Sequence, residues 1–211
     1  MGGTPVTASV EELLGLAIRH VNAGQRDRAR VLCEQAVLSH PPHPAISQLL
    51  ALLALQDGDA AASADLCAAS LALRPGHPPT LLLAGDAARA LGRLSKAAEC
   101  YGQVTRLLPE RADAWFLLSL VRHDLRDLAG AAQALRQVLR LAPGHVEAEV
   151  NLGVVLQDSG EIDEAMRAYG RAYRLREDSF GRIAHALSAA NVGRLWLDLG
   201  ELRAALRAMP A

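Results

Sequence analysis

The sequence predicts an all-α protein built from repeated pairs of helices, on two observations. The first is composition: of 211 residues, 51% are hydrophobic but only 3% are aromatic, so most apolar residues are Ala, Leu and Val. Small and straight-chain residues favour helices, whereas a β-sandwich or barrel would hold more β-branched and aromatic residues. The second is a 34-residue period in the sequence. A fixed period of roughly 20 to 50 residues indicates a repeat architecture.

Prolines and glycines mark this period. A Gly just after a first helix adopts the left-handed conformation at least cost, and a Pro stops the second helix. The recurring residues are Pro41, Pro75, Pro109 and Pro143, together with Gly24, Gly58, Gly92 and Gly160. They divide the chain into five expected units, at residues 10–43, 44–77, 78–111, 112–145 and 146–179. Positions are counted from the first residue of each unit.

Two positions hold small residues in every unit. The eighth position holds Ala17, Ala51, Gly85, Ser119 and Gly153, and the twentieth holds Ala29, Ser63, Ala97, Ala131 and Ala165. Helices packed about 8 to 10 Å apart leave room only for small side chains at their points of closest contact. Each unit is therefore expected to form one antiparallel helical hairpin.

These columns resemble the tetratricopeptide repeat, a 34-residue helix-turn-helix unit. The match covers residues 10–179, and among the residues that carry it are Gly85, Gly92, Ala97, Tyr101, Pro109 and Trp115. The resemblance implies a right-handed superhelical solenoid of antiparallel helix pairs. Four residues depart from the pattern: Ser47 and Glu149 replace the large fourth residue, Arg126 replaces a turn Gly, and Glu177 replaces the last Pro.

The two ends of the chain lie outside the five units. Residues 1–9 are expected to form a flexible N-terminal tail, with Ser9 and Glu12 spaced as a capping box before the first helix. Residues 180–211 are expected to form a C-terminal helical cap, in which Trp196 fills the last hydrophobic seam and Asp198 starts a short helix ending near Met209. The alternative is a degenerate sixth repeat.

Charge and hydropathy exclude several classes of partner. The formal net charge is −1, with 22 basic and 23 acidic residues, so no excess charge favours a nucleic acid. Lys96 is the sole lysine, and scattered Arg residues are typical of solvated helix faces. No apolar stretch approaches the roughly 20 residues of a membrane-spanning helix, and residues 1–9 do not resemble a secretion signal. A cytoplasmic protein is expected.

The sequence carries no pattern typical of catalysis, so we expect no enzyme activity, no cofactor and no metal. His43, His77 and His145 share the thirty-fourth position, but adjacent units lie on the order of 10 Å apart, too far to share a zinc ion. We therefore expect solvated histidines. Cys33 and Cys67 share the twenty-fourth position and are expected to be packing residues.

In the family that these columns resemble, the first helices line a concave groove with positions two, five, nine, twelve and thirteen. In this sequence those columns predict a groove from Leu14, Ile18, Val21, Asn22, Gln48, Leu52, Leu55, Gln56, Leu82, Asp86, Arg89, Phe116, Leu120, His123, Asp124, Val150, Val154, Gln157 and Asp158. Such a surface suits an amphipathic helix or an extended apolar peptide of a partner protein. Some of these aliphatic residues could instead be core between neighbouring first helices.

Two details refine the expected partner. Family members that bind a C-terminal carboxylate use Lys, Arg and Asn at positions five and nine, and this clamp is missing because the first three units hold Leu14, Ile18, Gln48, Leu52, Leu82 and Asp86 there. Phe116 is the single aromatic residue of the groove columns, and binding energy concentrates in buried aromatic anchors.

The resemblance favours a protein-interaction adaptor or assembly factor. The alternative is a non-catalytic helper subunit of an enzyme such as a glycosyltransferase or methyltransferase, which follows from analogy of fold alone. A third possibility is self-association through an exposed seam of the repeats.

Overall fold

The computed structural model describes residues 8–189 and 198–210, and every regular element in these ranges is a helix. The prediction of an all-α chain is confirmed. The chain forms two compact units, residues 1–107 and 108–211, and we describe each by itself.

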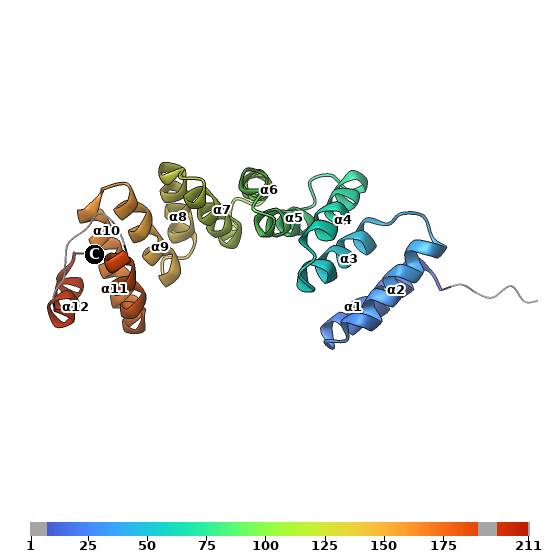
Figure 1. The fold of residues 1–211 in the computed structure, drawn as a ribbon, viewed down its shortest axis with the longest axis horizontal. Helices are drawn as coiled ribbons and strands as arrows, with labels where there is room; N and C mark the ends of the chain where they lie inside the picture. The colour runs from blue at the N-terminus through green and yellow to red at the C-terminus, as the bar shows by residue number, and fades with distance from the viewer. Residues whose placement is uncertain (1–7, 190–197, 211) are drawn as a thin grey trace, which may run out of the picture. The chain divides into compact units, whose positions relative to one another are not determined.

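The first unit contains three hairpins (Figure 1). In each, two helices of nearly equal length pack side by side across a turn of three residues. The pairs are α1 (Val10–Asn22) with α2 (Arg26–Ser39), α3 (Pro44–Gln56) with α4 (Ala60–Leu73), and α5 (Pro78–Ala90) with α6 (Leu94–Leu107). The sequence predicted this pairing, since short connections make successive helices antiparallel neighbours.

The second unit contains two hairpins followed by shorter helices. The hairpins are α7 (Ala112–Asp124) with α8 (Leu128–Leu141) and α9 (Val146–Asp158) with α10 (Ile162–Leu175). A short 3₁₀ turn, η1 (Glu177–Ser179), leads into α11 (Phe180–Ala189), and α12 (Leu199–Ala208) follows. α11 contacts α9, and α12 contacts α10.

The turns show why glycine recurs. Gly24, Gly58, Gly92 and Gly160 all have positive φ, between 69° and 85°. Among the described residues, Arg126 is the one non-glycine residue with positive φ, at 62°, and it occupies the turn position where glycine stands in the other units. The replacement of glycine by Arg126 therefore leaves the backbone of this turn unchanged.

The structure corrects the expectation for the histidines of the thirty-fourth position. His43, His77 and His145 are half-buried and stand immediately before α3, α5 and α9, as N-cap residues. The Nδ1 atom of His145 accepts a hydrogen bond from the backbone N–H of Ala148 (3.2 Å), and that of His77 lies 2.9 Å from the Thr80 hydroxyl. Burial, together with Arg74, lowers the pKa of His77. Of the three side chains, that of His145 caps its helix, and all three are half-buried and not simply solvated.

The small residues of the eighth position lie against large residues of the paired helix. A methyl group added at Gly85 would lie 2.5 Å from the ring of Tyr101, which is fully buried. Gly153 bears the same relation to Tyr169, also fully buried. Close approach of the two helices in these hairpins therefore requires glycine.

The cysteines are packing residues, as the sequence predicted. Cys33, Cys67 and Cys100 are free and buried, and burial raises the pKa of both Cys33 and Cys67 to about 11. Thiols of this kind are poor nucleophiles at neutral pH, because the thiolate is the reactive form.

Helix α1 begins, and helix α12 begins and ends, near the residues that the sequence predicted. Ser9 and Glu12 form the reciprocal capping box before α1, and the Asp198 carboxylate accepts hydrogen bonds from the first backbone N–H groups of α12. Leu202 and Leu206 of α12 are buried in the core of the second unit. We propose that α11 and α12 cap this unit. Trp196 lies outside the described residues.

The helix contacts predict opposite effects for two glycine substitutions. Gly85→Ala should destabilise the protein by roughly 1 to 3 kcal/mol, because the buried Tyr101 ring must move. Gly15→Ala, in α1, meets nothing within 4 Å and should stabilise by about 0.5 to 1 kcal/mol through helix propensity. Thermal unfolding followed by circular dichroism measures both. A Gly85→Ala protein as stable as the parent would contradict the close helix contact.

Candidate partner-binding groove

The first helices of the first unit line a groove of about 410 Å³. Its walls come from α1, α3 and α5, and α3 contacts both of the others. The lining residues are Leu14, Ile18, Ala45, Gln48, Leu49, Leu52, Pro79, Leu82, Leu83 and Asp86. Six of these were predicted from the sequence: Leu14, Ile18, Gln48, Leu52, Leu82 and Asp86.

Helical spacing explains why positions five and nine meet in one groove. Residues four apart lie on the same face of a helix, one turn from each other. Leu14 and Ile18, Gln48 and Leu52, and Leu82 and Asp86 are three such pairs on consecutive first helices. Ile18 is 43% exposed, so its aliphatic surface is accessible to a partner.

The sequence missed four lining residues. Ala45 and Pro79 occupy position two of their units, a column expected to line the groove. Leu49 and Leu83 occupy position six, which was not among the columns expected to line the groove. Asn22, Gln56 and Arg89 are exposed near the ends of their helices but do not line this groove.

Asp86 is the charged residue of the lining, and a buried tyrosine holds it. The Tyr101 hydroxyl donates a hydrogen bond of 2.6 Å to Oδ1 of Asp86. Burial, together with this carboxylate, raises the pKa of Tyr101 well above its usual range, so the phenol stays protonated and remains a donor. The groove thus combines an aliphatic surface with one fixed carboxylate.

In the second unit, several predicted groove residues are engaged within the protein. Phe116 is half-buried and stacks on His145, with ring centroids 5.0 Å apart. His123 Nε2 lies 2.9 Å from Oδ2 of Asp158, which also accepts a hydrogen bond from Arg126 (2.9 Å). Truncating Phe116 would therefore affect folding as well as any binding. Leu120 and Val154 are half-buried and Asp124 is exposed.

The prediction that Val150 and Gln157 line the groove is wrong, because both side chains are buried. Val150 is only 3% exposed and belongs to the core of the second unit, which includes Ile183 and Leu187 of α11. Gln157 is 2% exposed, and its Oε1 accepts a hydrogen bond from the Tyr169 hydroxyl (2.9 Å). Neither side chain is accessible to a partner.

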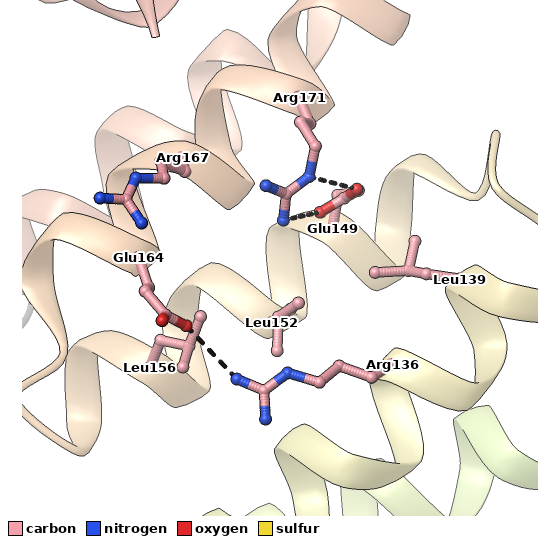
Figure 2. Close-up of a pocket in the computed structure, with 8 residues that line it drawn as sticks. All are labelled: Arg136, Leu139, Glu149, Leu152, Leu156, Glu164, Arg167 and Arg171. Atoms are coloured by element: carbon pink, nitrogen blue, oxygen red, sulfur yellow. Dashed lines mark hydrogen bonds and ion pairs between the residues drawn. The ribbon is translucent and has the colours of Figure 1, made fainter. Parts of the chain in front are cut away.

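The second unit also has a charged pocket of about 310 Å³, formed by α8, α9 and α10 (Figure 2). It lies where Glu149 replaces the large residue of position four. The Glu149 carboxylate is buried and accepts two hydrogen bonds from Arg171, of 2.8 and 3.0 Å. Figure 2 shows Leu152 between this pair and the pair of Arg136 with Glu164, which is 3.4 Å long. The pairs within the pocket compensate most of its charge.

Two further features are absent from the described part of the chain. Residues 8–189 and 198–210 contain no group of three His, Cys, Asp or Glu side chains that could hold a metal ion. No helix in the same ranges is long and apolar enough to span a bilayer.

Comparison with known proteins identifies the family. Models of the tetratricopeptide repeat match residues 14–78, 82–146 and 123–190, so the chain belongs to the tetratricopeptide repeat family. A search of curated proteins gave no significant match.

Solved structures share the fold at low sequence identity. "Crystal structure of YrrB: a TPR protein with an unusual peptide-binding site" matches with a TM-score of 0.78 and 15% identity, over 84% of this chain and 91% of that one. "MamA 41-end from Desulfovibrio magneticus RS-1" matches with a TM-score of 0.75 and 16% identity, over 80% and 96%. "Crystal structure of MamA" matches with a TM-score of 0.73 and 18% identity, over 77% and 95%.

The buried Glu149–Arg171 pair predicts an asymmetry between two substitutions. Arg171→Ala should destabilise by about 3 kcal/mol, because it leaves the Glu149 carboxylate buried without its partner. Glu149→Leu restores a large apolar residue at position four and frees Arg171, which is 33% exposed, to reach water; its cost should be below about 1 kcal/mol. Thermal unfolding of both variants tests this. Equal losses would show that the pair contributes symmetrically.

Proposed function

We propose that this protein is a non-catalytic adaptor, located in the cytoplasm, that binds a short segment of a partner protein in the groove of its first unit. The observation that carries the proposal is the groove itself. Three consecutive first helices present aliphatic side chains to one cavity of about 410 Å³. This volume lies within the range of about 300 to 1,000 Å³ that is usual for ligand sites.

The lining chemistry favours a peptide over a small metabolite. Six of the ten lining residues are Leu or Ile, and the polar lining consists of Gln48 and Asp86. An amphipathic helix inserts aliphatic side chains spaced three or four residues apart into a groove of this kind, and an extended apolar segment inserts alternate ones. YrrB, which shares the fold, is described as having an unusual peptide-binding site, and this is consistent with the same use of the fold here.

A helper subunit of an enzyme stays an alternative within this proposal. Such a subunit would use the same groove, but its partner would be a glycosyltransferase or methyltransferase. The identity of a partner recovered from the native cell in fixed stoichiometry distinguishes the two.

Substitution in the groove tests the proposal. Random 12-residue peptides displayed on phage are selected on the full chain, and one recovered aliphatic peptide is measured by calorimetry. Leu52→Arg should weaken its binding by at least roughly 30-fold, because it places a charge in the apolar floor. Leu73→Arg is the matched control, since Leu73 is 49% exposed on α4 and outside the groove. If no aliphatic peptide is enriched, or if both variants bind equally, the groove is not the binding site.

One observation favours self-association as a second candidate function. α2 exposes Val31 and Leu38, which are 61% and 88% exposed and two turns apart on one helix face. The other units hold mostly polar residues in these columns: Asp65, Glu99, Gln133 and Arg167 at position twenty-two, and Ala72, Arg106, Arg140 and Arg174 at position twenty-nine. In the described repeats, these two columns are both aliphatic and strongly exposed only on α2, and adjacent exposed aliphatic residues are typical of contact surfaces.

The oligomeric state tests this second candidate. If two copies of the chain associate through α2, light scattering after gel filtration should give the mass of a dimer, and the double variant Val31→Glu with Leu38→Glu should give that of a monomer. Leu73→Glu, on α4, controls for the added charge. A monomer at every concentration tested would rule out this contact, and it would leave the groove proposal untouched.

A further inference from the structure

The groove is mainly aliphatic, but the carboxylate of Asp86 also lines it, and binding of an apolar segment alone gives this charge no role. Its Oδ1 atom accepts the hydrogen bond from Tyr101, and no ion pair to Asp86 forms within the described residues. A charge in an apolar groove costs free energy unless something compensates it. The side chain is half-buried and lines the groove, so the compensation can come from a bound segment.

The hairpin fixes this carboxylate in place. Tyr101 is fully buried and packs directly on Gly85, the residue preceding Asp86. Its hydroxyl therefore has little freedom to move, and it holds one oxygen of Asp86 while the other oxygen has no partner in the described part of the chain. A polar group held by buried, packed neighbours gives a site its directional specificity.

Arg89 lies one helical turn after Asp86, in the last turn of α5. It is exposed, and it affects the pKa of Tyr101 less than the Asp86 carboxylate does. Across residues 8–189 and 198–210, no ion pair within 4.0 Å joins Arg89 to Asp86. Arg89 therefore acts on the Tyr101 hydroxyl beside Asp86 and forms no ion pair with the carboxylate itself.

We propose that the segment bound by this groove carries a basic side chain, Lys or Arg, next to its aliphatic residues, and that Asp86 receives its cation. The proposal rests on the function proposed above and deepens it. An acidic or C-terminal group would face this carboxylate at the same point, and like charges in an interface are strongly unfavourable. The partner segment is therefore a basic, amphipathic one.

The substitution Asp86→Asn removes the charge of this side chain and keeps its size and shape. The Asn side-chain oxygen still accepts the hydrogen bond from Tyr101, so the groove keeps its form and loses only its charge. A charge-assisted hydrogen bond contributes more than a neutral one, so binding of a basic peptide should weaken by roughly 10-fold. The loss should shrink as salt is added, because the groove is open to solvent.

The experiment is a paired peptide selection. Random 12-residue peptides displayed on phage are selected in parallel on the full chain and on Asp86→Asn. The expected result is aliphatic residues from both selections, with Lys or Arg enriched at one fixed position only on the parent chain. A synthetic peptide from the parent selection and its Lys→Gln analogue are then measured against both proteins in a double-mutant cycle.

Two controls complete the design. Arg89→Gln keeps the carboxylate and removes the competing cation, so its preference for the basic peptide should equal or exceed that of the parent chain. If Asp86→Asn does not fold, as seen by circular dichroism, the Lys→Gln peptide measured against the parent chain still decides the matter.

The outcomes separate this inference from the proposed function. Aliphatic peptides without a basic preference, or equal binding of the Lys and Gln peptides by the parent chain, would overturn the role of Asp86 and leave the groove intact. Failure to recover any aliphatic peptide would remove the groove, and the inference with it.

Discussion

Close approach of the two helices in each hairpin is the constraint on which the rest of this structure depends. The eighth and twentieth positions hold only Ala, Gly or Ser, and larger side chains there would push the helices apart. At Gly85 the same constraint also shapes the groove of the first unit. Because that residue has no side chain, the Tyr101 ring can lie against α5, and its hydroxyl can reach Asp86 on the groove side of the same helix.

The sequence predicted most of the fold, since its signals are local. Glycines with positive φ, small residues at contact points and Pro after second helices each act within a few residues, and the period repeats them. The groove of the first unit was predicted from the columns that the resemblance to the tetratricopeptide repeat implies, and helical geometry explains why two of those columns agree with the structure. Positions five and nine of a helix lie on one face whatever the neighbouring unit does, so Leu14, Gln48 and Leu82 were found with their partners one turn on.

What the sequence could not predict depends on contacts between segments that do not share the period. Val150 is buried in a core that α11 helps to form, and the helical pattern of α11 does not say where it packs. The burial of the Glu149 carboxylate could not be predicted for the same reason. A carboxylate at a core position is tolerated because Arg171, 22 residues later, donates two hydrogen bonds to it, and no column of the repeat relates the two residues.

The two buried tyrosines of the twenty-fourth position have a wider consequence. Tyr101 holds Asp86, and Tyr169 holds Gln157, so the residue chosen in the interior of a hairpin fixes a polar group on the opposite helix. The first two units place Cys33 and Cys67 in that column and have no such donor. At Asp86 that polar group lines the groove, so an interior substitution at Tyr101 would change the groove surface, and comparing homologues by their surface residues alone would overlook it.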